Sequence, residues 1–175
     1  MPRYDASNAE CLVFSFKDGF LAKLAHDLKI KVSRFEINVA DDRSSVEASF
    51  DATSLEVVCR RIDGRDDPGG LNKLELMTIH GNIKDDVLAA KKFPKITFRS
   101  TEVVASPDGG AKVKGDLTLH GQTRSISTDV KPEGGRLVTE LRLHQPDFGI
   151  KPYSAALGAL KVQADVVVRL SIPAG

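Results

Sequence analysis

The sequence predicts an all-β fold in which antiparallel strands close into a barrel, and three observations predict it. Apolar residues recur at every second position in many short segments, as they do in half-buried strands. Polar turns separate most of these segments, which favours antiparallel neighbours. Only one long segment with helical spacing, residues 71–92, interrupts them. Eight or nine such strands form either a barrel or a sandwich. We favour the barrel because closure removes exposed strand edges.

The N-terminal part is predicted to contain short strands and one short helix. Apolar side chains in residues 20–27 follow helical spacing, so we expect a short helix after the first strand. The alternation changes phase between Val32 and Phe35, which indicates a bulge or bend there. The predicted strand segments in this part are residues 12–16, 30–32, 35–39, 46–50 and 55–59.

The C-terminal part is predicted to be a helical insertion followed by a meander of strands. Within residues 71–92, apolar residues recur at three- and four-residue intervals, and residues 80–82 are expected to divide two short helices. Pro94 has no N–H to donate, so it suits the start of a strand. The predicted strands are residues 96–105, 112–120, 124–130, 137–144 and 160–172, with irregular chain at 145–159.

Composition excludes several functional classes. A chain of 175 residues and 18.9 kDa has the size of a single domain, residues 1–175. The net charge of +1 argues against a dedicated nucleic-acid surface. The four histidines and two cysteines lack metal-ligand spacing, so we expect neither a metal nor a cofactor. No apolar run is long enough to span a bilayer.

Catalytic and targeting signatures do not stand out either. The sequence has no GxSxG, HExxH, P-loop or GxGxxG motif, so we do not expect an enzyme. If Met1 is the native start, the N-terminus lacks a secretory leader, from which we expect a cytoplasmic protein. His120 stands beside Gly121, and we expect a turn residue whose ring binds a neighbouring backbone group.

Three motifs in the sequence resemble the YceI-like family of lipocalin-like proteins. They are KFPKITFRS at residues 92–100, VKGDLTLHGQT at residues 113–123 and DFGI at residues 147–150. Their order and spacing also agree with the family, and the resemblance extends from about Cys11 to Ile172. Residues 20–28, FLAKLAHDL, depart from the family's more usual His-Leu-Gly type sequence.

The resemblance implies an eight-stranded antiparallel lipocalin-like barrel whose elongated apolar interior binds polyisoprenoid chains. Without the resemblance, ordinary packing of the inward side chains against one another is the simpler interpretation. Many members of the family are periplasmic. The predicted apolar lining consists of Phe14, Phe16, Phe20, Leu24, Leu28, Phe50, Ile96, Phe98, Leu117, Leu119, Leu141, Phe148, Val166 and Val168. The predicted headgroup contacts at the mouth are His26, Lys23 and Arg60.

The sequence therefore predicts a non-catalytic protein that binds, stores or transports a long-chain isoprenoid lipid, such as an isoprenoid quinone. A buried methylene contributes about 0.8 kcal/mol, so a prenyl chain can bind with little polar help. The alternative is a side-chain-filled barrel that acts as a protein-interaction or stress-related module through loops 63–70 and 145–159. The sequence leaves open whether the chain forms a homodimer and whether Cys11 and Cys59 are oxidised.

Overall fold

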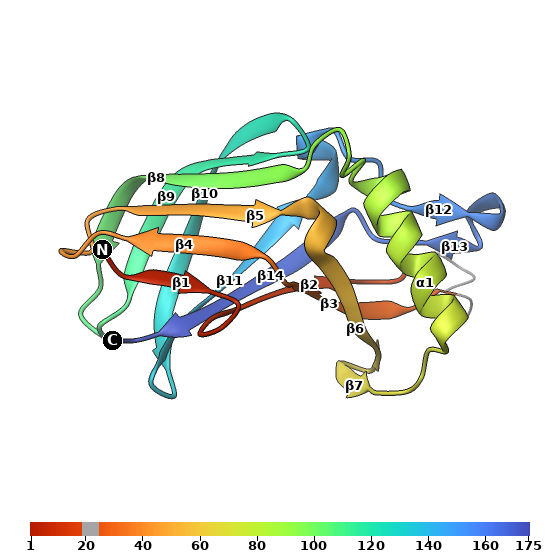
Figure 1. The fold of residues 1–175 in the computed structure, drawn as a ribbon, viewed down its shortest axis with the longest axis horizontal. Helices are drawn as coiled ribbons and strands as arrows, with labels where there is room; N and C mark the ends of the chain where they lie inside the picture. Colours follow the sequence, from red (N-terminus) through yellow and green to blue (C-terminus); the bar gives the residue numbers. More distant parts are fainter. Residues whose placement is uncertain (19–24) are drawn as a thin grey trace.

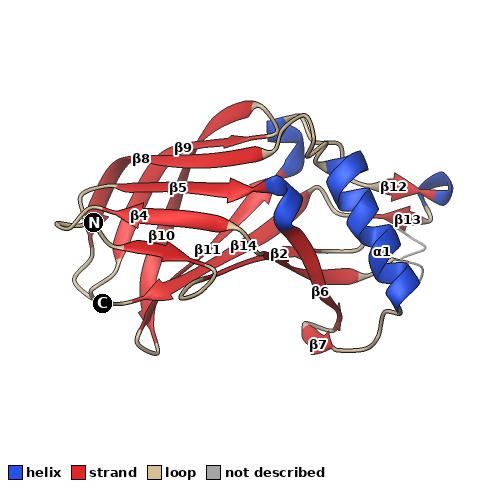
Figure 2. Cartoon of the chain, viewed as in Figure 1, coloured by secondary structure: helices blue, strands red, loops and turns tan. Residues whose placement is uncertain are grey.

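A strongly curled antiparallel sheet dominates the computed structural model, which describes residues 1–18 and 25–175 (Figures 1 and 2). The sheet has twelve strands in the order β1-β4-β5-β8-β9-β10-β11-β14-β2-β3-β6-β7, and β12 and β13 form a separate hairpin. The strands are β1 (Arg3–Asp5), β2 (Glu10–Ser15), β3 (Asp27–Val32), β4 (Phe35–Val39), β5 (Val46–Asp51), β6 (Leu55–Ile62), β7 (Arg65–Asp67), β8 (Lys95–Ala105), β9 (Ala111–Leu119), β10 (Gln122–Glu133), β11 (Arg136–His144), β12 (Ser154–Ala155), β13 (Leu160–Lys161) and β14 (Asp165–Pro173).

The expected count of eight strands is wrong, because three long segments are each divided into two strands. Residues 6–9 separate β1 from β2, and the 3-10 turn Ala52–Ser54 separates β5 from β6. Ser33 and Arg34 separate β3 from β4, which places a bend where the sequence alternation changes phase. The short β7, which pairs with β6, is the twelfth strand. The predicted strand at 160–172 is likewise divided, into β13 and β14.

The divided segments let the sheet curl, because the two halves of a segment pair with different neighbours. β3 pairs with β2 and β6, whereas β4 pairs with β1 and β5. Since only Ser33 and Arg34 join β3 to β4, strands from opposite ends of the strand order lie close together. Ser54 fixes this bend, accepting a hydrogen bond from Arg34 N–H on its Oγ at 3.0 Å. The result is a barrel-like sheet with an inner and an outer face.

The helical insertion differs from the prediction in its bounds and its continuity. Helix α1 (Lys73–Gly81) begins with a capping box, in which Glu75 N–H donates to Asn72 Oδ1 at 2.9 Å and Asn72 N–H donates to Glu75 Oε2 at 2.8 Å. The predicted break at residues 80–82 is wrong, because the helix continues directly into a π-helical turn, Asn82–Val87. Gly81 and Asn82 both keep helical backbone angles there. Residues 88–94 form bends and a turn with no helix, so the helical segment ends earlier than predicted.

The predicted short helix at residues 20–27 falls largely outside the described residues. Positions 20–24 are not described, and Asp27 already belongs to β3. In Figure 1 both chain termini lie at one end of the sheet, while α1 and the β12–β13 hairpin lie at the other. No helix among the described residues has the length and apolar character needed to cross a membrane.

His120 occupies a tight turn between β9 and β10. The turn consists of His120 and Gly121, and their φ values are 54° and 73°. Positive φ at both central residues is what a two-residue hairpin turn of type I′ requires. His120 Nδ1 lies 3.2 Å from the Phe148 carbonyl oxygen, and its ring packs 4.5 Å from the Phe93 ring centroid. The expected structural role of His120 is therefore confirmed.

Candidate functional site

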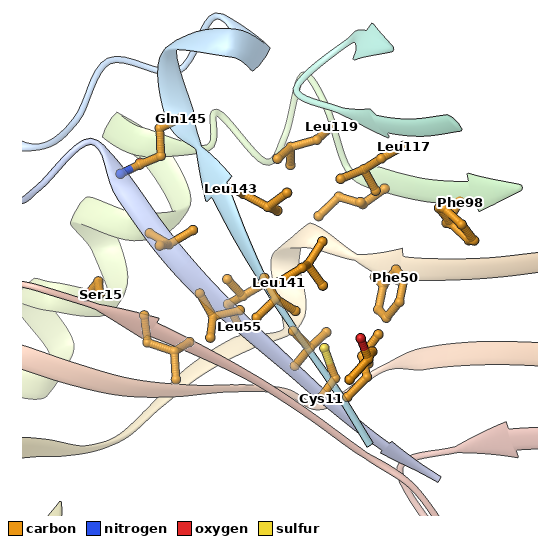
Figure 3. A pocket seen from close by; sticks show the side chains of 18 of the residues that line it. Cys11, Ser15, Phe50, Leu55, Phe98, Leu117, Leu119, Leu141, Leu143 and Gln145 are labelled. Atoms are coloured by element: carbon orange, nitrogen blue, oxygen red, sulfur yellow. The ribbon is translucent and has the colours of Figure 1, made fainter. Parts of the chain in front are cut away.

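The inner face of the curled sheet surrounds a pocket of about 720 Å³ (Figure 3). This volume lies within the range of about 300–1,000 Å³ that is typical of ligand pockets. Strands from different sides of the sheet contribute to it, with Cys11 on β2, Phe50 on β5, Leu117 on β9 and Leu141 on β11. Figure 3 shows these side chains pointing towards a common space.

The pocket runs between the two ends of the sheet. At the end near the chain termini it reaches Tyr4, Arg43 and Gly110, which lie on β1 and on hairpin turns. At the other end it reaches Asn82 and Tyr153, which lie beside α1. Apolar clusters form its walls, among them one that contains Cys11, Val32 and Ile37 and another that contains Leu117, Leu143, Phe148 and Ile150. Val168 of β14 packs against both clusters, so it marks the middle of the pocket.

Aromatic side chains shape the wall where β5, β8 and β9 meet. Phe98 lies directly over Gly115, where an added Cβ would come within 2.5 Å of Phe98 Cζ and within 2.4 Å of the Arg99 carbonyl oxygen. The ring of Phe50 stacks on the ring of Phe35, with centroids 5.8 Å apart. The absence of a side chain at Gly115 therefore leaves the space that the Phe98 ring occupies.

Few charged side chains line the pocket, and in the described part of the chain each has another partner. Arg43 Nη2 donates to the Ala174 carbonyl oxygen at 3.0 Å. Glu75 is engaged in the capping box of α1. Lys161 Nζ lies 3.9 Å from an Asp18 carboxylate oxygen. The remaining polar lining is mainly uncharged and includes Ser15, Thr78, Asn82, Gln145 and Tyr153.

Most of the predicted apolar lining residues lie in the pocket wall. Within the described chain these are Leu28, Phe50, Ile96, Phe98, Leu117, Leu119, Leu141, Phe148, Val166 and Val168. His26, one of the predicted headgroup contacts, also lies at the wall. Phe20, Lys23 and Leu24 belong to residues 19–24, which the structure does not describe. Whether any of these residues binds a ligand remains a prediction.

Three of the predicted residues do not line the pocket. The inward positions of β2 are Cys11, Val13 and Ser15, so Phe14 lies on the opposite face. The Arg61 guanidinium lies 4.8 Å from the Phe14 ring centroid, a cation–π arrangement on the outside of the sheet. Phe16 is also absent from the pocket wall.

Arg60 does not line the pocket either, although its β3 partner Leu28 does. Its Nε donates to an Asp67 carboxylate oxygen at 2.6 Å, which ties β6 to β7. The sequence places Asp67 in a loop, so this ion pair could not be predicted from it.

Several lining residues were missed by sequence reasoning. Val13 lines the pocket in place of the predicted Phe14, because both faces of β2 are apolar and alternation alone cannot choose between them. Asn82 and Tyr153 come from the helical insertion and the irregular segment, and Asn82 Nδ2 donates to Tyr153 Oη at 3.0 Å. Gln145 Nε2 donates to the Gln163 carbonyl oxygen at 3.1 Å. No periodic signal in the sequence points to these polar contacts.

Cysteine and metal chemistry have little support at this site. Cys11 and Cys59 are both buried free thiols. Burial, with a smaller contribution from the Glu10 charge, raises the pKa of the Cys11 thiol to about 12, so Cys11 stays protonated at neutral pH. Among the described residues, no group of three His, Cys, Asp or Glu side chains is placed to hold a metal ion.

The fold and the pocket together define an all-β, barrel-like protein with a pocket on the inner face of its sheet. The chain belongs to the YceI-like family, because the YceI-like domain matches residues 6–174. A UPF0312 protein from Vibrio cholerae (strain El Tor Inaba N16961) is 41% identical over 81 residues, which cover 41% of this chain and 43% of that protein. A UPF0312 protein from Pseudomonas putida F1 is 36% identical over 93 residues, which cover 46% of this chain and 47% of that protein. The chain thus spans less than half the length of the curated relatives it matches.

Solved structures share the fold at low sequence identity. The crystal structure of BcnA from Burkholderia cenocepacia has a TM-score of 0.67 and 14% identity, covering 96% of this chain and 97% of that one. A polyisoprenoid binding domain from Saccharophagus degradans, implicated in plant cell wall breakdown, has a TM-score of 0.57 and 12% identity. The match covers 94% of this chain and 91% of that one. At these identities the similarity concerns the fold alone.

Proposed function

We propose that this protein binds a long apolar lipid of the polyisoprenoid class in its internal pocket and performs no chemistry on it. The observation that supports the proposal is a pocket of about 720 Å³ whose wall is mostly apolar. Apolar surface removed from water contributes about 25 cal/mol per Å², so such a wall favours an apolar ligand without a polar motif. The polyisoprenoid binding domain from Saccharophagus degradans has a similar fold, which favours this ligand class.

A prenyl chain can bind such a pocket with useful affinity. Drug-sized ligands gain about 0.3 kcal/mol per non-hydrogen atom, so a chain of about twenty carbons would gain about 6 kcal/mol. That free energy corresponds to a Kd of tens of micromolar, and about 8 kcal/mol corresponds to about 1 μM. Because Arg43, Glu75 and Lys161 have partners within the protein, the chain of the ligand is expected to supply most of this free energy.

The polar groups of the wall support a binding role and not a catalytic one. A catalytic nucleophile needs a base within hydrogen-bond reach. Cys11 is the thiol in the wall, and its raised pKa keeps it in the unreactive protonated form. The amide of Asn82 donates to the hydroxyl of Tyr153, which orders the wall and activates neither group.

Solvent extraction of the purified protein, followed by mass spectrometry of the extract, tests the proposal. We expect an isoprenoid lipid in the extract of the native protein. Val168→Trp fills the middle of the pocket and should remove the lipid, because Val168 packs against both apolar clusters. Val167→Trp is the matched control, since Val167 is the neighbouring residue of β14 and lies outside the pocket wall.

Both variants are first checked for cooperative thermal unfolding, so that loss of lipid is not mistaken for loss of fold. Lipid in the native protein and in Val167→Trp, with none in Val168→Trp, supports binding in the pocket. The proposal fails if the native protein neither carries an isoprenoid nor binds one added from solution. It also fails if Val168→Trp retains the lipid at the native level.

A further inference from the structure

The wall of the curled sheet is incompletely paired between β10 and β11. These strands form a backbone ladder only from Val130↔Thr139 to Glu133↔Arg136, next to their hairpin turn. By contrast, β10 pairs with β9 along residues 122–130, and β11 pairs with β14 along its whole length. Residues 122–129 of β10 and residues 140–144 of β11 therefore face each other without a ladder.

Hydrogen bonds close the unpaired stretch between β10 and β11 at both of its ends. Near the hairpin, Thr128 Oγ1 and Thr139 Oγ1 lie 2.5 Å apart, and Thr139 Oγ1 donates to the Asp129 carbonyl oxygen at 2.9 Å. At the far end, the segment after β11 returns to the β9–β10 turn, where Phe148 O lies 3.2 Å from His120 Nδ1. Between these two ends, one further hydrogen bond joins the facing strands in the described part of the chain. Thr128 Oγ1 donates it to the Glu140 carbonyl oxygen, at 3.5 Å.

The same side chains can be reached from both sides of the wall. Ile126, Thr128 and Leu141 line the internal pocket, and they also line a depression on the outer face of the sheet. All three are only half-buried, whereas Leu117 on the fully paired neighbouring strand is 7% exposed. Figure 3 shows Leu141 pointing into the pocket. The opening is therefore apolar at its centre.

Its outer rim is polar and charged. The depression is bordered by Ser127, Asp129 and Lys131 on β10, by Glu140 and Arg142 on β11, and by Arg169 on β14. Arg169 is held by two carboxylates, with its Nη1 2.7 Å from Glu140 and its Nη2 2.9 Å from Glu133. Water can solvate such a rim and the unpaired backbone groups, so the strands can stay apart without a buried polar group being left unsatisfied.

The two ends of the pocket are tied more firmly. At one end, α1 is held to β6 by Val57 N–H, which donates to His80 Nε2 at 2.7 Å, and Leu76 and Ile79 pack against the core. At the other end, Arg43 donates to Ala174 at 3.0 Å. These tertiary contacts hold the elements at both ends of the pocket, whereas in the described part of the chain few hydrogen bonds join β10 to β11 beyond their short ladder.

We propose that the opening between β10 and β11 is a lateral portal through which an apolar chain enters and leaves the internal pocket. This inference rests on the proposed function and adds the route that the ligand takes. Ile126 and Leu141 form an apolar passage, and the charged rim stays in water while the chain slides between the strands. The portal changes how fast the ligand exchanges, and the pocket sets how tightly it is held.

A chemical staple across the opening tests the portal. If the ladder continued in the register of Val130↔Thr139, Ser127 would face Arg142 on the outer face of the sheet. The variant Ser127→Cys with Arg142→Cys is therefore cross-linked by a short bismaleimide. The control variant, Ser125→Cys with Asp116→Cys, places the same staple across the closed β9–β10 seam, where these two residues are partners. Mass spectrometry verifies both staples, and the native Cys11 and Cys59 are buried.

Exchange is followed with all-trans-retinol, an isoprenoid alcohol whose fluorescence reports an apolar environment. Stopped-flow mixing gives the association and dissociation rates, and titration gives the Kd. We expect the staple across the opening to slow both rates at least tenfold and to leave the Kd within about twofold. The control staple should change neither rate by more than about twofold.

The binding and exchange measurements distinguish failure of the proposed function from failure of the portal. If the unstapled protein binds neither retinol nor longer prenols, the proposed function is wrong and the portal fails with it. If the unstapled protein binds retinol and the staple across the opening leaves both rates unchanged, the portal alone is wrong. A larger Kd at unchanged association rate would also overturn it, because the staple would then act on the pocket.

A second pair of variants tests the portal without cross-linking. Thr128→Val removes the hydroxyl that joins β10 to Thr139 at the edge of the opening, and it should raise both exchange rates several-fold. Thr123→Val is the matched control, because the Thr123 hydroxyl lies 2.8 Å from Thr118 Oγ1 across the paired β9–β10 seam. Equal rates in Thr128→Val and Thr123→Val would contradict the portal.

Discussion

Gly115 is the position where the shape of the pocket wall depends most directly on a single atom. Gly115→Ala adds a Cβ that would lie 2.5 Å from Phe98 Cζ and 2.4 Å from the Arg99 carbonyl oxygen. The ring of Phe98 can turn into the pocket, but the Arg99 oxygen belongs to the paired backbone of β8 and cannot move alone. We therefore expect overpacking to lower the free energy of unfolding by about 2 kcal/mol, within the usual range of about 1–3 kcal/mol.

Thermal and urea unfolding measure this effect. For a chain of this length, about 2 kcal/mol corresponds to a fall in Tm of about 4–8 °C. A double-mutant cycle with Phe98→Leu separates the two clashes, because the shorter side chain relieves the contact with the ring and leaves the contact with Arg99. We expect Gly115→Ala to cost less in the Phe98→Leu background than in the native protein.

Gly81→Ala is the matched control for this prediction. Gly81 is the last residue of α1, its φ is −61°, and an added Cβ would meet nothing within 4 Å. Alanine should stabilise the helix there by about 0.5–1 kcal/mol. The interpretation of the wall is refuted if Gly115→Ala unfolds within about 0.5 kcal/mol of the native protein, or if its cost is the same with and without the Phe98 ring.

Two further predictions concern ionisable groups. Hydrogen bonds from the Thr53 hydroxyl and N–H, with a contribution from Arg34, lower the pKa of Asp51 from 3.8, so its stabilisation is present above pH 4 and is lost as the pH falls through the folded-state pKa. Asp51→Ala should therefore lower the free energy of unfolding by about 1 kcal/mol at pH 7 and progressively less in acid, and a difference independent of pH in urea unfolding would contradict this. The Cys11 pKa of about 12 predicts native-state alkylation by iodoacetamide about a thousandfold slower at pH 8 than for an ordinary thiol, and rapid modification before unfolding would contradict it.

The strand meander from β8 to β11 follows closely from the sequence. Pro94 stands just before β8, and Gly134 and Gly135, which both have positive φ, form the turn after β10. These are local signals, because a missing N–H or a positive φ restricts the backbone whatever the rest of the fold does. Alternation then assigned Leu117 and Leu119 to the inner face, where the structure places them.

The errors arise where the deciding contact lies far away in the sequence. Phe14 and Val13 are both apolar, and their faces follow from the pairing of β2 with β14 and β3, which leaves Phe14 beneath the Arg61 guanidinium of β6. Arg60 is held by an ion pair with Asp67, in a strand that the sequence presents as a loop. The opening between β10 and β11 could not be predicted either, because alternation indicates the faces of a strand and not which of its backbone groups are paired.

The dependence of affinity on chain length tests the central claim most directly. Prenyl alcohols of increasing length are titrated against the protein by competition with retinol, under identical conditions. If the internal pocket holds the chain, each added isoprene unit should lower the Kd about tenfold, or about 1.4 kcal/mol, until the pocket of about 720 Å³ is full. A Kd that does not change with chain length would contradict binding in the pocket.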